Sequence, residues 1–214
     1  MKKGARYDVS TLIEAQFEPG SRGRVLRNLL GITRVREMNG VETVALQSAM
    51  DRFFRRFDEG HRFTVEDIRE MHRAWLGQIY PWAGEYRGVN VSKGDFMFAA
   101  AARVPALMLD FQKNVLARRT LCRFPDRAEV SDPLAEVHVE LVLIHPFREG
   151  NGRIARALAI LMAAQAGLPQ IDFSPISGRR RNEYFAAVQA GMDRNYRPMA
   201  VIFADLIERS LGAS

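Results

Sequence analysis

Apolar residues recur at helical spacing along most of the chain. They do so at residues 41–57, again from Ile68 to Ile79, and again at residues 101–116, each time placing an apolar stripe on one helix face. Thr64 and the acidic residues after it are typical of a helix start, and Pro81 marks the end of the same helix. These segments predict amphipathic helices that face a common core.

The second half of the chain predicts helices that are buried on nearly every side. Residues 134–144 are almost wholly apolar and follow a Ser-Asp-Pro start signal, and another apolar helix begins near Gly152 and ends before Gly167. We therefore expect a helix, a loop and a second helix over residues 133–166. Further helices are expected at residues 177–192 and after Pro198.

One short stretch changes from helical period to alternation. Apolar residues at positions 89, 91, 96 and 98 flank Lys93-Gly94-Asp95, a pattern that predicts a two-stranded hairpin over residues 89–98. Its free edge could pair with an extended segment of another protein. The alternative is that the hairpin is purely structural. The expected fold is all-α, a helical bundle with this small β-hairpin.

Length and composition favour one domain in a reducing compartment. The 214 residues contain no linker long enough to separate two cores, so we expect a single domain over 1–214, with 1–24 as an N-terminal extension. The net charge of +6 favours anionic partners, although a solvated basic surface is the simpler interpretation. Cys122 is the single cysteine, and no apolar segment follows the basic start, so a cytoplasmic location is expected. Delivery into another cell remains open.

The densest cluster of candidate chemistry is residues 145–156, which run from a loop into a helix. Gly150 and Gly152 stand where a helix begins, and unpaired N–H groups at such a point bind phosphate. Arg153 and Arg156 lie three residues apart, so both side chains are expected to face the same anion. This stretch predicts a phosphate site.

Two further residues of this stretch indicate a reaction rather than binding alone. Glu149 would repel phosphate unless it holds a divalent cation shared with the phosphate oxygens, as is usual for Mg²⁺. His145 precedes a proline, so it is expected at a helix end, where its imidazole can accept a proton from a hydroxyl. The predicted ligand is a metal-bound nucleotide or polyphosphate.

Residues 145–156 match the Fic family motif His-x-Phe-x-(Asp/Glu)-Gly-Asn-Gly-Arg-x-x-Arg at every specified position. The chain also resembles stand-alone bacterial Fic proteins near residues 25–28, 82–87 and 195–199. The resemblance implies a Fic-type bundle whose hairpin forms a flap beside the catalytic loop. It also implies transfer of AMP from ATP to a Tyr, Thr or Ser hydroxyl of a target protein, with Mg²⁺ bound.

The resemblance also implies a role for each matching residue. His145 would be the general base, Glu149 the Mg²⁺ ligand and Phe147 an anchor for the loop. Gly150, Asn151 and Gly152 would cradle the α- and β-phosphates, with Arg153 and Arg156 at the outer ones and Tyr184 near the adenine. The target would dock on Val91, Ser92, Lys93, Gly94, Asp95 and Phe96.

Other functions and modes of regulation stay open from the sequence. The alternatives are a Doc-like protein kinase, a partner-regulated toxin module that only binds nucleotide, and a helical nucleic-acid binder, for which no recognition helix is evident. The stretch from Ser10 to Glu14 nearly matches the family's inhibitory motif, whose glutamate pairs with the second motif arginine, here Arg156. Because that match is incomplete, we expect any inhibition to come from a separate small antitoxin-like chain.

Overall fold

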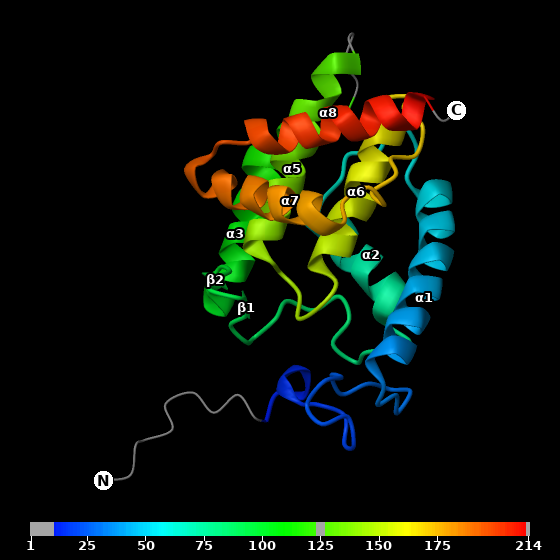
Figure 1. The fold of residues 1–214 in the computed structure, drawn as a ribbon, viewed down its shortest axis with the longest axis vertical. Helices are drawn as coiled ribbons and strands as arrows, with labels where there is room; N and C mark the ends of the chain where they lie inside the picture. Colours follow the sequence, from blue (N-terminus) through cyan, green and yellow to red (C-terminus); the bar gives the residue numbers. More distant parts are fainter. Residues whose placement is uncertain (1–10, 123–126, 213–214) are drawn as a thin grey trace.

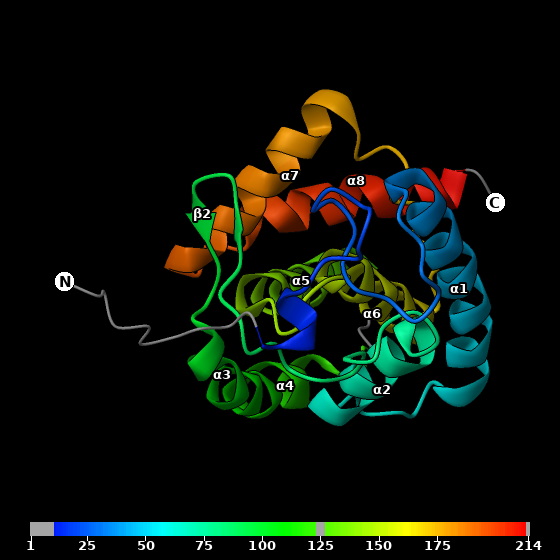
Figure 2. The same cartoon turned by 90° about the horizontal axis from the view of Figure 1, so that it is seen from below.

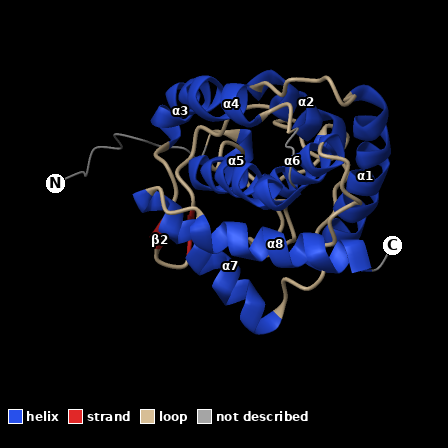
Figure 3. Cartoon of the chain, turned by 90° about the horizontal axis from the view of Figure 1, so that it is seen from above, coloured by secondary structure: helices blue, strands red, loops and turns tan. Residues whose placement is uncertain are grey.

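The computed structural model describes residues 11–122 and 127–212, and these residues are mostly helical. Two buried helices, α5 (Ser131–Ile144) and α6 (Asn151–Gln165), run side by side through the middle of the molecule (Figure 1). Views along the bundle show the other helices arranged around this pair (Figures 2 and 3). The prediction of a helical fold with one small hairpin is confirmed.

The surrounding helices pack their apolar stripes onto the central pair, and α5 is covered by the last helix. They are α1 (Val35–Arg56), α2 (Val65–Leu76), α3 (Val104–Phe111), α4 (Ala117–Arg119), α7 (Gly178–Ala190) and α8 (Arg197–Gly212). Between α3 and α4, the segment Gln112–Leu116 winds as one π-helical stretch. None of the described helices is both long and apolar enough to cross a bilayer.

Some observed helix ends differ from the predicted ones, because the apolar pattern follows buried residues rather than the helix itself. The first helix begins at Val35 rather than at residue 41. Its first two turns are exposed apart from Met38, so they carry no apolar stripe from which the sequence could predict them. Thr64 caps α2 as predicted: its hydroxyl accepts the N–H of Asp67, whose carboxylate accepts the N–H of Thr64. That helix ends at Leu76, and Ile79 is buried beyond it.

The hairpin is present but shorter than predicted. Strands β1 (Ser92–Lys93) and β2 (Phe96–Met97) pair antiparallel, with Lys93 opposite Phe96, and the N–H of Phe98 bonds to the carbonyl of Val91 at 3.2 Å. The strand residues are exposed or half-buried, since the hairpin packs by its stems rather than by its strands. It lies near the loop that joins α5 to α6 (Figure 2).

The N-terminal segment has little regular structure. Its described part begins at residue 11 and contains one 3-10 turn, Ile13–Ala15, so Ser10 of the near-match to the inhibitory motif lies outside the described residues. An isolated bridge pairs Phe17 with Leu26, and Glu18 binds the backbone N–H of Asn28. The segment from residue 11 to 34 therefore lies folded against the rest of the molecule.

Candidate functional site

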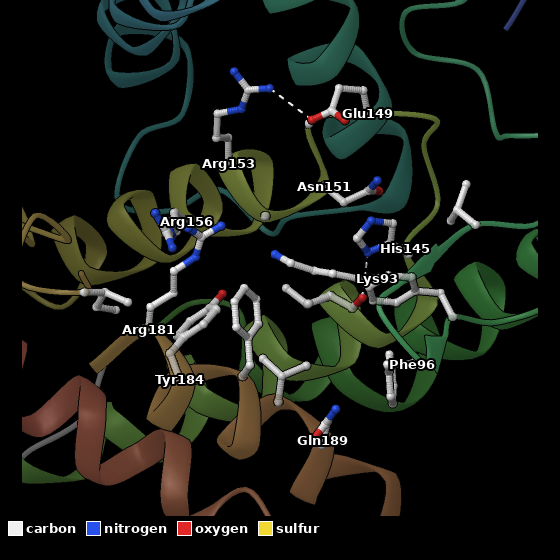
Figure 4. Close-up of a pocket in the computed structure, with 18 of the residues that line it drawn as sticks. Lys93, Phe96, His145, Glu149, Asn151, Arg153, Arg156, Arg181, Tyr184 and Gln189 are labelled. Atoms are coloured by element: carbon white, nitrogen blue, oxygen red, sulfur yellow. Dashed lines mark hydrogen bonds and ion pairs between the residues drawn. The ribbon is translucent and has the colours of Figure 1, made fainter. Parts of the chain in front are cut away.

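A pocket of about 890 Å³ opens between the α5–α6 loop, the hairpin and α7 (Figure 4). Its described lining contains five basic side chains and one acidic side chain, Glu149. The basic residues are Lys93, Arg148, Arg153, Arg156 and Arg181. This balance of charge suits a polyanionic ligand, because a cleft lined by one sign of charge concentrates the opposite sign.

His145 lies at the C-terminal end of α5 and lines the pocket. Its backbone is left-handed (φ 53°), which together with Pro146 ends the helix there. The Nδ1 atom lies 3.0 Å from the carbonyl of Val142 and must therefore donate, which leaves Nε2 as a free acceptor. The ring of Phe98, from the hairpin, stacks on the imidazole at 3.7 Å.

Burial makes the imidazole of His145 a neutral group. It lowers the pKa of His145 to about 4, and the charges of Arg87 and Lys93 act in the same direction. The bond to Val142 and the charge of Glu149 oppose the shift without reversing it. At neutral pH the imidazole is therefore unprotonated, which is the form that can accept a proton.

The loop after His145 is held by buried contacts. Phe147 is fully buried and stacks on His72 with ring centroids 3.9 Å apart. Asn151 closes the loop: its Oδ1 accepts the N–H of Phe147 and its Nδ2 donates to the carbonyl of Phe147, both at 2.8 Å. The side chain of Asn151 is thus engaged within the loop, so its backbone at the start of α6 is the part left to a ligand.

His72 is a structural residue with hydrogen bonds on both of its nitrogens. Its Nδ1 accepts the N–H of Gly84 at 2.8 Å, so Nε2 carries the proton that is donated to the carbonyl of Glu149 at 3.0 Å. The residue is completely buried and ties α2 to the loop of residues 145–151.

The two glycines of the loop differ in what they do. Gly150 has φ 83°, and a Cβ there would lie 2.7 Å from Cζ3 of Trp75, so both conformation and packing require glycine. A Cβ at Gly152 would meet no atom within 4 Å. Gly150 therefore shapes the loop, whereas Gly152 leaves open space over the N-terminus of α6 where an anion can approach.

The two motif arginines point away from each other, contrary to the expectation that both face one anion (Figure 4). Arg153 leans towards α1, where its Nη1 lies 2.6 Å from Oε2 of the buried Glu42, and its Nη2 lies 3.2 Å from Glu149. Arg156 lies over the rings of Phe173 and Tyr184 instead. Partners on separate helices draw the two side chains apart.

Arg156 is the motif arginine that stays directed to the pocket. Its guanidinium carbon lies 5.4 Å and 5.3 Å from the ring centroids of Phe173 and Tyr184, and its buried Nε has no hydrogen-bond partner among the described residues. A buried donor without a partner is costly unless a ligand fills its place. The position of Arg156 therefore suits an anionic ligand.

Tyr184 reaches the pocket from α7 but its hydroxyl is already bound. The oxygen lies 2.6 Å from Nε2 of His138, which is buried on α5, so His138 is a hydrogen-bonded core histidine. Burial raises the pKa of the Tyr184 phenol. The ring of Tyr184, rather than its hydroxyl, is the part available to a ligand.

Sequence reasoning did not identify some residues in or beside the pocket. On α1, Glu42 does not line the pocket but holds Arg153, which does. On α7, Phe185 lies 3.7 Å from Nζ of Lys93 and so bridges the hairpin to α7. Phe98 covers the imidazole of His145. The apolar alternation of the hairpin pointed to residue 98 as buried, but no sequence pattern pointed to Glu42 or Phe185.

The donor set fits Mg²⁺ held together with phosphate oxygens. Glu149 is about half exposed in the pocket, and its Oε1 is engaged by Arg153. Among the described residues, no group of three or more His, Cys, Asp or Glu side chains could hold a metal ion by itself. One carboxylate beside a polyanion site is the arrangement that suits Mg²⁺ rather than an all-protein metal site.

The candidate inhibitory glutamate near the N-terminus does not meet Arg156. Oε1 of Glu14 accepts the N–H of Gly88 at 2.6 Å, and the carbonyl of Glu14 accepts Nε of Arg148 at 2.9 Å. Glu14 thus binds the segment before the hairpin and the motif loop. Glu14 therefore does not make the pair with Arg156 that an inhibitory glutamate would make.

Acid is expected to destabilise the protein through three buried histidines. Burial lowers the pKa of His72 and His145 to about 4 and that of His138 to about 3, from 6.5. As the pH falls from 6.5 to 4, the unfolded chain gains protons that the folded chain does not, so stability falls by on the order of 3 kcal/mol per group. Urea unfolding between pH 7.5 and 4 measures the loss, and a midpoint independent of pH would contradict it.

Neutralising Glu42 is expected to weaken the contact between α1 and α6. Glu42 also accepts the hydroxyl of Tyr80 at 2.7 Å, so Glu42→Gln keeps one acceptor but removes the charge opposite Arg153. We expect the free energy of unfolding to fall by about 1–3 kcal/mol. Urea unfolding gives the value, with Tyr80→Phe as the control that removes the hydroxyl donor and keeps the charge of Glu42. Equal losses in the two variants would rule out a role for the charge.

Comparisons with known proteins point to one family. A family model described as Fic/DOC family matches residues 62–163. The chain is 32% identical over 149 residues to the protein adenylyltransferase Fic of Culex quinquefasciatus, covering 69% of this chain and 28% of that protein. It is 30% identical over 148 residues to the protein adenylyltransferase VbhT of Bartonella schoenbuchensis, covering 67% and 30%. The chain spans less than a third of the length of these two relatives.

A solved structure supports the same fold. The BepC protein of Bartonella tribocorum, solved with bound AMPPNP, superimposes with a TM-score of 0.71 and covers 92% of this chain and 97% of that chain. The sequence identity is 21%, so this likeness concerns the fold.

Proposed function

The chain carries a domain of the Fic/DOC family, and from this premise we propose that it transfers AMP from ATP to a hydroxyl side chain of a target protein. The observation that carries the proposal is the position of His145. Its neutral imidazole has a free Nε2 and lines the same pocket as the open N-terminus of α6 and Arg156. A base and a polyanion cradle in one pocket suit transfer of a phosphate-containing group to a hydroxyl.

The reaction would be a displacement at the α-phosphorus of ATP. The oxygen of a Tyr, Thr or Ser hydroxyl forms a bond to that phosphorus, the bond to the β-phosphate bridging oxygen breaks, and pyrophosphate leaves. Nε2 of His145 takes the proton of the attacking hydroxyl. The N–H groups at the start of α6, with Gly152 open above them, would bind the phosphates, and Arg156 would take an outer one.

Glu149 would hold Mg²⁺, which when bound neutralises charge on the phosphate oxygens. The same carboxylate pairs with Arg153 in this structure, so binding of the ion would release Arg153 from one of its two acidic partners. Arg153 would then turn from Glu149 to the outer phosphates while Glu42 still holds it on the other side.

Transfer of AMP is favoured over transfer of the γ-phosphate by the loop and by the relatives. Both glycines of Gly-Asn-Gly-Arg are present, and Gly152 leaves space at the start of α6. Two relatives at 30% identity or above carry the name protein adenylyltransferase. A Doc-like kinase is the competing proposal.

The products distinguish the two reactions. The protein is incubated with ATP, Mg²⁺ and a bacterial lysate, and pyrophosphate and ADP are measured with and without added protein. Adenylyl transfer releases pyrophosphate, and a kinase releases ADP. Pyrophosphate that rises with the added protein supports the proposal, whereas ADP alone would replace it with the kinase.

The target is proposed to dock on the hairpin. The strand residues Ser92 and Lys93 are exposed, and Met97 is 61% exposed, so most of the hairpin surface is open to a partner. An extended segment that pairs with a strand edge would bring its hydroxyl near His145, because Phe98 at the base of the hairpin touches the imidazole.

Inhibition, where it occurs, is proposed to come from a separate small chain. Glu14 binds Gly88 and Arg148 rather than Arg156, so this glutamate leaves Arg156 open to the pocket. We expect the chain to be active by itself and Glu14→Gly to give no increase, measured as pyrophosphate release. An inactive chain that Glu14→Gly switches on would show that residues 10–14 are the inhibitor.

A further inference from the structure

Arg87 is a buried cation in the segment that leads into the hairpin. It is 2% exposed, and its backbone N–H bonds to the carbonyl of Pro146 at 2.9 Å. Burial lowers the pKa of its guanidinium and the nearby Glu14 carboxylate opposes this, so the group stays charged at neutral pH. A buried charge of this kind is costly unless each of its donors is bound.

The guanidinium of Arg87 binds two parts of the site at once. Towards α5, Nε donates to the carbonyl of His145 at 2.6 Å and Nη2 to that of Ile144 at 3.3 Å. Towards the hairpin, Nη1 donates to the carbonyl of Val89 at 2.7 Å and Nη2 to that of Ala99 at 2.5 Å. Residues 89 and 99 are the two stems of the hairpin, so one side chain joins both stems to the end of α5.

This position stabilises the backbone that carries His145. The last carbonyls of a helix lack intrahelical partners and form the negative end of its dipole, so a cation there is favourable. The left-handed conformation of His145 is unfavourable for a residue with a Cβ, and the bonds from Arg87 to residues 144, 145 and 146 hold it in place.

The same bonds fix the hairpin relative to the imidazole. Phe98 directly precedes Ala99, and its ring stacks on the imidazole of His145 at 3.7 Å. A movement of the hairpin stems would therefore carry Phe98 across the ring that takes the proton. Among the residues that the structure describes, Arg87 is the side chain whose hydrogen bonds join both stems to the end of α5.

We propose that Arg87 is a positioning residue for the transfer reaction: it holds His145 and the target-docking hairpin as one unit. This inference rests on the proposed function. Arg87 is buried and does not line the pocket, so it would not contact a bound nucleotide. Its loss is therefore expected to impair the chemical step and target binding, and to leave nucleotide binding intact.

Lysine cannot replace this arginine fully. The planar guanidinium reaches four carbonyls in two directions, whereas an ammonium presents its donors from a single point. Arg87→Lys keeps the positive charge at the end of the helix but loses some of the hydrogen bonds that the guanidinium makes. Arg87→Met removes both charge and donors and keeps the aliphatic stem.

Arg73→Met is the matched control, because Arg73 pairs with Glu85 just before the same segment and its side chain is 45% exposed.

The test measures kcat, the KM for the target protein and the Kd for ATP in these variants. We expect Arg87→Met to lower kcat by about 10²-fold, the effect of a small misplacement of reacting groups, with Arg87→Lys intermediate. The Kd for ATP stays within about twofold and the KM for the target rises, while Arg73→Met behaves as wild type. A wild-type kcat in folded Arg87→Met, or a Kd for ATP that weakens in step with kcat, would overturn the inference.

Hydrogen exchange provides a readout that does not depend on the transferase activity. The amides of His145 and Phe98 bond to the carbonyls of Leu141 and Val91. In the Arg87 variants we expect both amides to exchange faster together, while the amides of α8 keep their rates. Should Arg87→Met fail to fold, Arg87→Lys serves the same comparison. Unchanged exchange at either amide would overturn the inference even if the protein proved to have another activity.

Discussion

Replacing His145 by alanine is expected to slow AMP transfer by about 10²–10⁴-fold, the contribution of a positioned general base. The imidazole is the one neutral base among the titratable groups of the pocket that the structure describes. Glu149 is paired with Arg153, the Tyr184 hydroxyl is bound to His138, and the other groups are lysine and arginine side chains. Nucleotide affinity should change little, because His145 is not part of the cationic cradle.

Single-turnover labelling measures the transfer rate, and binding of a non-hydrolysable ATP analogue measures the affinity. His61→Ala is the matched control, because His61 pairs with Asp67 on the far side of α2 and does not line the pocket. Transfer at the wild-type rate by His145→Ala would show that another group takes the proton, and the assignment of the base would be wrong.

The second large effect is expected from alanine at Gly150. The new Cβ would lie 2.7 Å and 3.0 Å from two ring carbons of Trp75, at a backbone φ of 83° that disfavours any residue with a Cβ. We expect the free energy of unfolding to fall by about 2–4 kcal/mol, from the strained backbone and the overpacked core together. Urea unfolding measures this loss.

Gly152→Ala is the control for this prediction. The two glycines stand two residues apart in the same loop, yet a Cβ at Gly152 meets nothing within 4 Å and its φ is not positive. Its stability should therefore stay near the wild-type value, while the added methyl group narrows the space over the N-terminus of α6 and weakens nucleotide binding. Equal loss of stability in both variants would show that the loop needs glycine at both positions for folding.

The helices and the loop could be predicted because their signals are local. Apolar periodicity gave the central helices, Thr64 with Asp67 gave the start of α2, and the glycines with His145 and Pro146 gave the turn between α5 and α6. Each of these depends on residues within a few positions of one another. The exposed start of α1 and the π-helical stretch Gln112–Leu116 carry no such local signal.

The directions of side chains in the site could not be predicted because they depend on partners distant in sequence. Arg153 and Arg156 were expected to share one anion, and their spacing allows it. The partner of Arg153 is Glu42, 111 residues earlier in the chain, and the partner of Arg156 is Tyr184 on α7. These partners turn the two arginines apart. The role of Arg87 is hidden for the same reason, since its acceptors are carbonyls without any sequence signature.

The most direct test of the proposed reaction determines whether the α-phosphate or the γ-phosphate of ATP is transferred to protein. The protein is incubated with Mg²⁺ and a lysate in parallel with ATP labelled at the α-phosphate and ATP labelled at the γ-phosphate, beside His145→Ala. We predict label on protein from the α-position alone, absent in His145→Ala. Label on protein from the γ-position alone would contradict adenylyl transfer and establish a kinase.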